Sequence, residues 1–342
     1  MVIAFHYLNG IERHRWGQAI QTYAAFGATG VDLFFVLSGF LLASILLERR
    51  NASTYFSSFY VRRVCRIFPL YFALLFAVLG IVPRVQAPAA DGNFSWGPAR
   101  VWWFFAYVQN YGMGFINEYR PVLLAPTWSL AVEEQFYAVL PAVVRWLSTR
   151  SLALCAMLAW IGSAVLRVII VQTGVWPPLA ASTWSICRLD PLALGVLAAL
   201  LVRSGARLPS RLLVAAAVIL LGSCFLCAPW RTPLLDCFFI AAVAAGYTAL
   251  LLQCIWYPAG RIARFAAAPA FRWLGTISYG TYLLHAPVRC VVLALFRDST
   301  SRSIPLPGFL VTPLSLLLTL VLAQLSWRYF ERRFVAWSHR HA

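Results

Sequence analysis

The stretch that decides the fold class comes early, at residues 30–47, and reads GVDLFFVLSGFLLASILL. It contains a single charged residue, Asp32. A helix needs about 20 predominantly apolar residues to cross the hydrocarbon core of a bilayer, so this stretch predicts a membrane-spanning helix. The whole chain has the same character, because 61% of its 342 residues are apolar and only 11% are charged. Soluble globular domains have about 45–50% apolar and about 25% charged residues, so that class is excluded.

Other stretches of the chain share this length and apolar character. They lie at residues 67–82, 127–147, 152–171, 186–202, 212–228, 233–256, 274–296 and 306–325. Residues 1–8 are also apolar but would extend only about 12 Å as a helix, too short to cross the core. We therefore expect them to be the end of a truncated first helix. Residues 101–115 are aromatic and interrupted by polar residues, so we expect a short segment that does not span the membrane.

The arginines orient these helices. The chain has 28 basic residues, all of them arginine, against 11 acidic residues, and its net charge is +17. In membrane proteins the cytoplasmic loops carry the excess of basic residues. A ten-helix arrangement with both termini in the cytoplasm places 17 arginines in cytoplasmic loops and 8 outside. The sequence therefore predicts an all-α integral membrane protein, a bundle of about ten transmembrane helices that forms one domain over residues 1–342.

Two kinds of partner are not expected from this sequence. Nucleic-acid binding needs basic residues gathered on one exposed stripe, whereas these arginines are scattered between apolar stretches. A zinc site needs a full set of ligands, and Cys224 and Cys227 have no second cysteine pair or histidine nearby to complete one. We therefore expect neither nucleic acid nor a metal ion.

Ionisable residues inside spanning stretches are costly, and they mark functional sites by default. The predicted topology places several of them in the outer half of the bilayer, on five helices: His6, Asp32, Glu133, Glu134, Arg188, Asp190, His285 and Arg289. One buried acid/base cluster accounts for them more simply than separate penalties on five helices do. We therefore expect these side chains to lie at a common depth.

Several of these residues also have a purely structural interpretation. Asp32 lies at the start of its stretch, where a carboxylate suits the positive end of the helix dipole. Arg188 and Asp190 are two residues apart, so they do not face each other on a helix, and either can pair across helices. A histidine inside a membrane often bonds neighbouring helices. His285 fits that interpretation better than His6 does.

The densest basic feature is FYVRRVCRIFP at residues 59–69. In a helix, the spacing of Arg62, Arg63 and Arg66 puts their side chains on adjoining faces. Guanidinium groups bind phosphate through two parallel hydrogen bonds, which suits a nucleotide-like ligand on the cytoplasmic side. The alternative is a topology signal lying on anionic lipid. Spacing alone leaves both interpretations open.

A set of motifs runs in order along nearly the whole chain. They are FH at 5–6, GVDLFFVLSGF at 30–40, FYVRRVCRIFP at 59–69, TWSLAVEEQFY at 127–137, RLD at 188–190, ISYGTYLLH at 277–285 and FERRF at 330–334. This ordered set resembles the integral-membrane acyltransferases of the acyltransferase type 3 group. The resemblance implies a single membrane-embedded acyltransferase domain over residues 1–342, also with ten helices.

Members of that family move an acyl group, often acetyl from acetyl-CoA, onto a hydroxyl of a sugar or other envelope component. The resemblance maps the family's first-helix histidine onto His6, its basic inner motif onto Arg62, Arg63 and Arg66, and its acidic pair onto Glu133 and Glu134. The chain departs from the family in one respect. Family members usually carry an arginine about ten residues before that histidine, and here Met1 comes too late for one. With the short first helix, this indicates a truncated or misassigned start.

Acyl transfer assigns a role to each of these groups. We expect His6 either to take the hydroxyl proton as a base or to carry the acyl group, because an imidazole titrates near neutral pH. One carboxylate of the acidic pair would orient that imidazole and balance its charge, and the other would serve structure. The inner arginines would hold the phosphates of CoA. Further candidates for the cavity and the acceptor are Asp32, Ser38, Trp128, Arg188, Asp190, Tyr282 and His285, although packing also explains them.

The expected partners follow from the resemblance. Acyl-CoA, in particular acetyl-CoA, would be the co-substrate, with no cofactor bound, and a sugar, glycan or lipid-linked acceptor would approach from outside. We expect the chain in a bacterial inner (plasma) membrane with both termini cytoplasmic. One alternative is a proton-coupled transporter, although the paired repeats and interrupted helices common in transporters are not evident. The other is a non-catalytic relative that flips or senses a lipid-linked glycan.

Overall fold

The structure is a computed structural model of the chain, and it describes residues 1–8, 23–85, 99–295 and 308–341. Throughout these residues the regular elements are helices, and no strand occurs in them. The all-α class predicted from the apolar stretches is confirmed. A helix pairs its backbone N–H and C=O groups with one another. Helices can therefore lie in the hydrocarbon core, where no water is available to bond these groups.

The long helices of the described chain coincide with the stretches predicted to span. They are α3 (Gly30–Glu48), α4 (Tyr55–Val85), α7 (Thr127–Trp146), α8 (Thr149–Thr173), α10 (Leu189–Arg203), α11 (Ser210–Leu226), α12 (Pro233–Trp256), α14 (Pro269–Leu295) and α15 (Gly308–Ser326). The helix α1 (Val2–Leu8) occupies the short N-terminal stretch.

Five segments of the described chain are long and apolar enough to cross a membrane: Ala25–Glu48, Tyr55–Gly80, Thr149–Thr173, Pro233–Trp256 and Leu310–His341. They establish the membrane character of the fold. The count of ten spanning helices stays a prediction.

Short helices connect the long ones. They are η1 (Ala25–Thr29), α5 (Val101–Phe105), α6 (Gln109–Ile116), η2 (Val122–Leu124), α9 (Pro178–Thr183), η3 (Ser185–Cys187), η4 (Ala228–Trp230), α13 (Arg261–Ala266), the π-helical turn η5 (Trp327–Glu331) and α16 (Arg332–His341). The aromatic stretch predicted not to span forms α5 and α6, which are 5 and 8 residues long. At 1.5 Å per residue, neither can cross the core.

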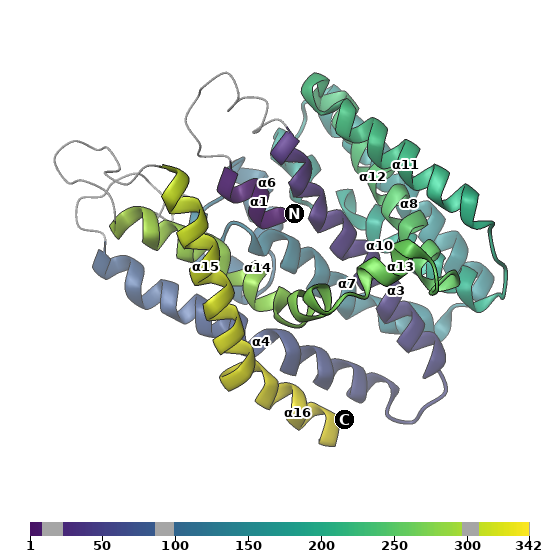
Figure 1. Cartoon of the computed structure of the whole chain (residues 1–342), viewed down its shortest axis with the longest axis horizontal. Helices are drawn as coiled ribbons and strands as arrows, with labels where there is room; N and C mark the ends of the chain where they lie inside the picture. Colours follow the sequence, from purple (N-terminus) through teal and green to yellow (C-terminus); the bar gives the residue numbers. More distant parts are fainter. Residues whose placement is uncertain (9–22, 86–98, 296–307, 342) are drawn as a thin grey trace.

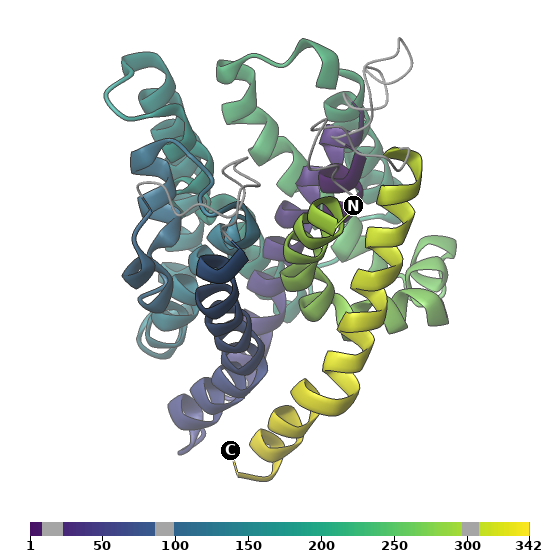
Figure 2. The ribbon, with the colours of Figure 1, turned by 90° about the vertical axis from the view of Figure 1, so that its left-hand side faces the viewer.

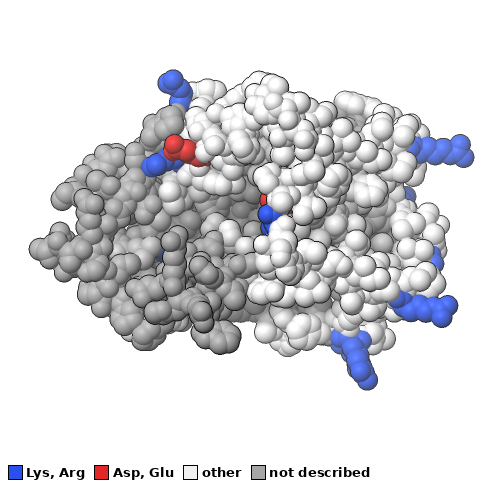
Figure 3. Space-filling model, turned by 90° about the horizontal axis from the view of Figure 1, so that it is seen from above, with Lys and Arg blue, Asp and Glu red and all other residues white. Residues whose placement is uncertain are grey.

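The helices form two packed groups, which Figures 1 and 2 show from two directions. In one group α10 packs against α3, α8 and α12, and α11 packs against α12. In the other, α14 packs against α15, α16 packs against α4, and α1 lies against α14 and α15. The helix α7 lies between the two groups, where it contacts α3 and α6 (Figure 1). Seen from above, the described surface is mostly uncharged, and basic and acidic atoms meet in a hollow near its centre (Figure 3).

Glycines allow a close contact between α3 and α10. A Cβ atom on Gly39 would lie 2.1 Å from the carbonyl oxygen of Leu192, and one on Gly195 would lie 2.3 Å from that of Val36. Small residues at helix interfaces let the backbones approach in this way, which is the common basis of helix packing in membranes. The contact fixes α3, which carries Ser38, relative to the rest of the bundle.

Two helix starts differ from the predicted boundaries. The helix α10 begins at Leu189 rather than at residue 186, because the separate turn η3 precedes it and Pro191 suits a first helical turn, where an N–H is not needed. The helix α4 begins at Tyr55, well before residue 67. The basic motif is therefore helical, which places Arg62 and Arg66 one turn apart.

Candidate active site

His6 lies in the last turn of α1, and its imidazole meets that of His285 in α14. The two ring centroids are 4.9 Å apart, with the ring planes tilted by 47°. Arg289 donates a hydrogen bond to the carbonyl oxygen of His6, one of the last-turn carbonyls that lack a partner within their helix. The Tyr7 hydroxyl donates to the carbonyl oxygen of His285 at 3.1 Å. These contacts bring histidines from opposite ends of the chain together.

A cavity of about 520 Å³ lies beside the two imidazoles, and we call it the outer cavity. Its polar and aromatic lining includes His6, Tyr119, Trp128, Tyr282, His285 and Arg289. The lining therefore combines two imidazoles, one guanidinium and broad aromatic faces. Such a mixture of apolar walls and a few convergent polar groups is typical of a small-molecule site.

A second cavity, of about 260 Å³, adjoins the outer cavity, and we call it the middle cavity. The two have Val2, Val31 and Tyr282 in common among their lining residues. The middle cavity is also lined by Arg63, Arg66, Ser129, Glu133, Tyr137 and Tyr279. Tyr282 stands at the junction, where its hydroxyl lies 2.6 Å from that of Ser129 and donates to the carbonyl oxygen of Pro126 at 2.8 Å.

Glu133 is the buried carboxylate of the middle cavity. The Ser38 hydroxyl donates to Glu133 Oε1 at 2.6 Å and lies 2.7 Å from the Tyr137 hydroxyl. Ser38 thus belongs to the same cluster, behind the cavity wall. Glu134 is absent from the lining of these cavities, and its buried Oε1 has no hydrogen-bond partner among the described residues. No hydrogen bond joins either carboxylate to His6 in this part of the chain.

The third cavity, of about 320 Å³, lies at the far end of the series, and we call it the inner cavity. It is lined by Arg49, Arg62, Arg63 and Arg66 of the α3–α4 region and by His339 of α16, among other residues. Arg63 and Arg66 also line the middle cavity. The three cavities therefore form a series, which runs from a cluster of guanidinium groups to the pair of imidazoles.

The C-terminal motif holds Arg66 in place. Glu331, buried in the π-helical turn η5, faces Arg66 with 3.7 Å between Oε2 and Nη1. The guanidinium carbon of Arg66 lies 4.9 Å from the ring centroid of Trp327 and 5.8 Å from that of Tyr279. Such π-helical turns occur frequently at functional sites. Here the turn supplies both a carboxylate and an aromatic face to one arginine.

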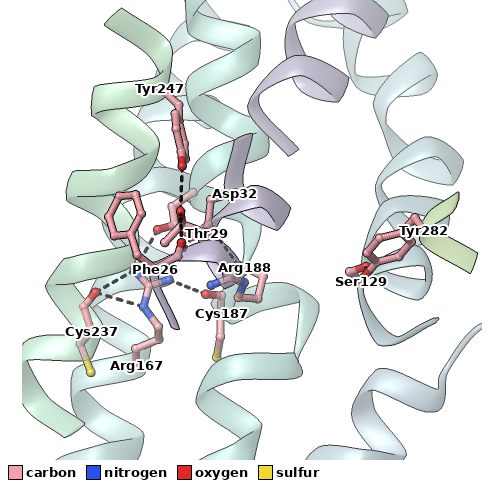
Figure 4. A network of polar contacts seen from close by, with 11 residues as sticks. Phe26, Thr29, Asp32, Ser129, Arg167, Cys187, Arg188, Cys237, Tyr247 and Tyr282 are labelled. Carbon is pink, nitrogen blue, oxygen red and sulfur yellow. Dashed lines mark hydrogen bonds and ion pairs between the residues drawn. The ribbon is translucent and has the colours of Figure 1, made fainter. Parts of the chain in front are cut away.

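Asp32, Arg188 and Asp190 lie in separate buried ion pairs, and none of them lines the three cavities. Figure 4 labels Asp32, Arg188 and Arg167 of these pairs. Arg188 pairs with Asp32, with 2.5 Å between Nη2 and Oδ1. Arg167 of α8 pairs with Asp190 through two hydrogen bonds of 2.9 and 2.8 Å. Both pairs cross between helices, as the two-residue spacing of Arg188 and Asp190 had suggested. The cluster expected at one depth is thus divided into ion pairs and cavity residues.

Arg188 links its ion pair to the outer cavity. Its guanidinium carbon lies 5.5 Å from the ring centroid of Trp128, on the wall of that cavity. Figure 4 shows Ser129 and Tyr282 set apart from the ion pairs. This ion pair therefore contacts the wall of the outer cavity at Trp128.

The family of this chain follows from comparison with known proteins. The family described as "Acyltransferase domain" matches residues 1–328. The chain belongs to this acyltransferase family. The resemblance expected from the ordered motifs is therefore confirmed. No solved structure is significantly similar to the chain.

Relatives of this chain carry names that specify an acceptor. It is 30% identical over 335 residues to the putative peptidoglycan O-acetyltransferase YrhL of Bacillus subtilis, covering 90% of this chain and 50% of that protein. It is 27% identical over 349 residues to the peptidoglycan O-acetyltransferase OatA of Listeria monocytogenes, covering 91% and 51%. The chain thus spans about half the length of the curated relatives it matches.

Sequence reasoning missed several residues of this chain that the structure brings forward. Arg167 is the partner of Asp190, and its position inside an apolar run is a signal that could have identified it. Tyr7 holds the backbone at His285, because its hydroxyl donates to the carbonyl oxygen of that residue. Glu331 lies in the closing motif, but the sequence does not reveal that it faces Arg66.

Proposed function

We propose that this acyltransferase is a membrane O-acetyltransferase, which takes the acetyl group of cytoplasmic acetyl-CoA and passes it to a hydroxyl of a glycan on the outer side. The observation that carries the proposal is the series of three cavities. It joins an arginine-lined opening to a pair of imidazoles through shared lining residues. A donor with a phosphate-rich head and a long acyl-bearing arm fits that arrangement.

The inner cavity supports the choice of a CoA donor. Arg62, Arg63 and Arg66 line it on one helix, and guanidinium forks bind phosphate oxygens in pairs. Arg63 and Arg66 also line the middle cavity, so an arm that starts at these arginines would enter it directly. That arm would pass Glu133 and Tyr282 before it reaches His6.

The outer cavity supports a carbohydrate acceptor. Trp128, Tyr119 and Tyr282 present aromatic faces, against which the apolar face of a sugar ring packs, and Arg289 adds a donor of hydrogen bonds. The names of the relatives favour peptidoglycan as the glycan. His6 would act on the acceptor hydroxyl as a base or carry the acetyl group to it. The role of Glu133 or Glu134 beside the imidazole stays a prediction.

In this proposal the histidine pair lies toward the outer side, and α16 with the C-terminus lies on the cytoplasmic side of a bacterial inner membrane. The cytoplasmic position of the N-terminus stays a prediction. The arginine distribution supports this orientation. Figure 2 shows α16 at the end of the bundle remote from α1.

The test is transfer of labelled acetyl from acetyl-CoA to peptidoglycan by membranes that contain the chain, with release of free CoA thiol measured in parallel. We expect His6→Ala to abolish both label transfer and the thiol release that depends on the acceptor, whereas His341→Ala, on the exposed last turn of α16, keeps them. A transporter or a glycan-sensing relative would release no thiol. Thiol release without labelled peptidoglycan would refute peptidoglycan as the acceptor and support acetyl-CoA as the donor.

Donor binding has a separate test. Arg66→Ala should raise the acetyl-CoA concentration needed for half-maximal rate, because one phosphate partner is lost. Arg150→Ala is the matched control, since Arg150 is an exposed arginine at the start of α8 and outside the cavities. Equal dependence on acetyl-CoA in both variants would refute the assignment of the inner cavity.

A further inference from the structure

His285 has a polar atom that the fold leaves unsatisfied. Its side chain is 0% exposed and lines the outer cavity. Among the residues that the structure describes, its Nε2 has no hydrogen-bond partner. Nearly all buried polar atoms in proteins are hydrogen-bonded, so an exception at a cavity wall points to a ligand group as the missing partner.

The other ring nitrogen fixes which kind of partner Nε2 needs. His285 Nδ1 lies 2.5 Å from the carbonyl oxygen of Tyr282, one turn earlier in α14. A carbonyl oxygen only accepts hydrogen bonds, so Nδ1 must carry the hydrogen and donate it. In a neutral imidazole the remaining nitrogen then carries a lone pair. His285 Nε2 is therefore a proton acceptor, on a residue that lines the outer cavity.

His6 lies opposite this acceptor. The ring centroids are 4.9 Å apart, and both rings line the same cavity. Backbone contacts hold both residues, because Arg289 donates to the His6 carbonyl and Tyr7 donates to the His285 carbonyl. The Tyr7 hydroxyl also lies 2.7 Å from the hydroxyl of Thr319 in α15. Two imidazoles therefore line the outer cavity in fixed positions, although the proposed function uses only one of them.

We propose that the two histidines divide the reaction, and this rests on the proposed function. His6 carries the acetyl group, and His285 is a second catalytic residue, whose Nε2 takes the proton of the acceptor hydroxyl. His285 is suited to the proton because its tautomer leaves a lone pair on Nε2, which has no partner among the described residues, and because the residue lines the outer cavity. His6 lies one turn after Val2 in α1, and Val2 lines both the outer and the middle cavity. His6 is therefore suited to meet the arriving thioester.

The reaction then has two balanced steps. In the first, a ring nitrogen of His6 forms a bond to the carbonyl carbon of the thioester, the carbon–sulfur bond breaks, and the electron pair leaves on the sulfur of CoA. In the second, the acceptor oxygen forms a bond to that carbon while its proton moves to His285 Nε2. The carbon–nitrogen bond breaks and its electron pair returns to His6. The proton on His285 is finally lost to the CoA thiolate or to water, so acetyl-CoA and the alcohol yield the ester and free CoA.

The two steps can be measured separately in the full chain in bilayers. Exchange of labelled CoA into acetyl-CoA, without acceptor, reports the first step alone. Transfer of labelled acetyl to peptidoglycan reports both. We expect His285→Asn to keep exchange close to the wild-type rate and to lose about 10²–10⁴-fold in transfer, the usual contribution of a general base. His6→Ala should lose exchange and transfer together.

Asparagine at position 285 separates a catalytic role from a structural one. Its amide nitrogen takes the place of Nδ1 and still donates to the Tyr282 carbonyl, but it offers no base at the place of Nε2. His285→Ala removes both groups. If His285 is a base, Asn and Ala reduce transfer to a similar extent. Recovery of transfer in the Asn variant relative to Ala would overturn the proposal in favour of a structural hydrogen bond.

Other outcomes also decide the question. A parallel loss of exchange and transfer in His285→Asn would overturn the proposal, because His285 would then act through His6. Transfer without exchange in the wild-type protein would overturn the acyl-carrying role of His6 and leave direct transfer. A wild-type protein with neither activity would refute the proposed function itself, and exchange without transfer to peptidoglycan would refute the acceptor alone.

Discussion

Replacing Arg167 by methionine strands a carboxylate inside the bundle. Arg167 and Asp190 are only 1% and 0% exposed, and two hydrogen bonds join them. Removing one partner of a buried ion pair costs about 3–5 kcal/mol, because the remaining charge is left without compensation. Arg167 also donates to the carbonyl oxygens of Cys187 and Cys237, and each of these hydrogen bonds adds about 1 kcal/mol. We therefore expect Arg167→Met to lower the free energy of unfolding by about 5–7 kcal/mol.

A second substitution separates the two contributions. In the double variant Arg167→Met/Asp190→Leu both charges are gone, and only the two carbonyl hydrogen bonds are missing, which costs about 2 kcal/mol. The double variant should therefore be more stable than Arg167→Met by about 3–5 kcal/mol. Such a recovery is expected only if the stranded carboxylate dominates the cost of the single substitution.

The assay is reversible unfolding in bicelles, followed for the wild-type protein, both single variants and the double variant. Arg150→Met is the control, because Arg150 is exposed and its replacement should change the free energy of unfolding by less than about 0.5 kcal/mol. A double variant as unstable as Arg167→Met would show that the lost packing and carbonyl hydrogen bonds dominate. That result would refute the reasoning from the ion pair.

Three further predictions follow from contacts elsewhere in the bundle. Gly39→Ala should destabilise the protein by about 1–3 kcal/mol, because its Cβ would lie 2.1 Å from a backbone oxygen of α10. Gly222→Ala, with open space around the new Cβ, should be neutral or stabilising in the same unfolding assay in bicelles. Glu331→Gln should raise the KM for acetyl-CoA up to about fivefold with kcat retained. The reason is that a partly exposed ion pair with Arg66 contributes up to about 1 kcal/mol. An unchanged KM would refute the role of Glu331 in positioning Arg66. Trp128→Ala should raise the KM for the glycan about tenfold, equal to about 1.4 kcal/mol, and leave CoA exchange unchanged, whereas an equal loss of exchange would contradict its place on the acceptor side.

The helices could be predicted from the sequence because the bilayer imposes a local rule. A spanning segment must be apolar over its own length. A stretch such as residues 233–256 can therefore be identified without knowledge of its neighbours, and α12 has those same bounds. The start of α10 was predicted three residues too early, because the turn η3 is as apolar as the helix that follows it. Hydropathy identifies which residues are buried. It does not change where the backbone geometry changes inside an apolar stretch, so it cannot locate that boundary.

The candidate site could be predicted only in part, because its contacts are not local. The spacing of Arg62 and Arg66 was enough to place them together, since both lie on α4. The pairing of His6 with His285 depends on how α1 packs against α14, which no spacing in the sequence encodes. For Arg188, the two-residue separation from Asp190 excluded a mutual pair but left its partner open.

The hydrogen bonding of the buried polar groups explains why the expected cluster is divided. Asp32, Arg188, Arg167 and Asp190 compensate one another in pairs, as groups that remain inside a membrane must. Arg188 Nε lacks a partner within the described residues, but the charge of its guanidinium is already balanced by Asp32.

The cavity residues show the opposite pattern. Arg63 Nε and His285 Nε2 are buried and have no hydrogen-bond partner in the described part of the chain. They lie at the two ends of the series, one beside the inner cavity and one beside the outer cavity. A group left unsatisfied destabilises the fold by about 1–3 kcal/mol, which a structural role would not require. A phosphate of acetyl-CoA at Arg63 and a hydroxyl of the glycan at His285 would supply the missing partners. The same two atoms that lower the stability of the fold would then favour binding of both substrates.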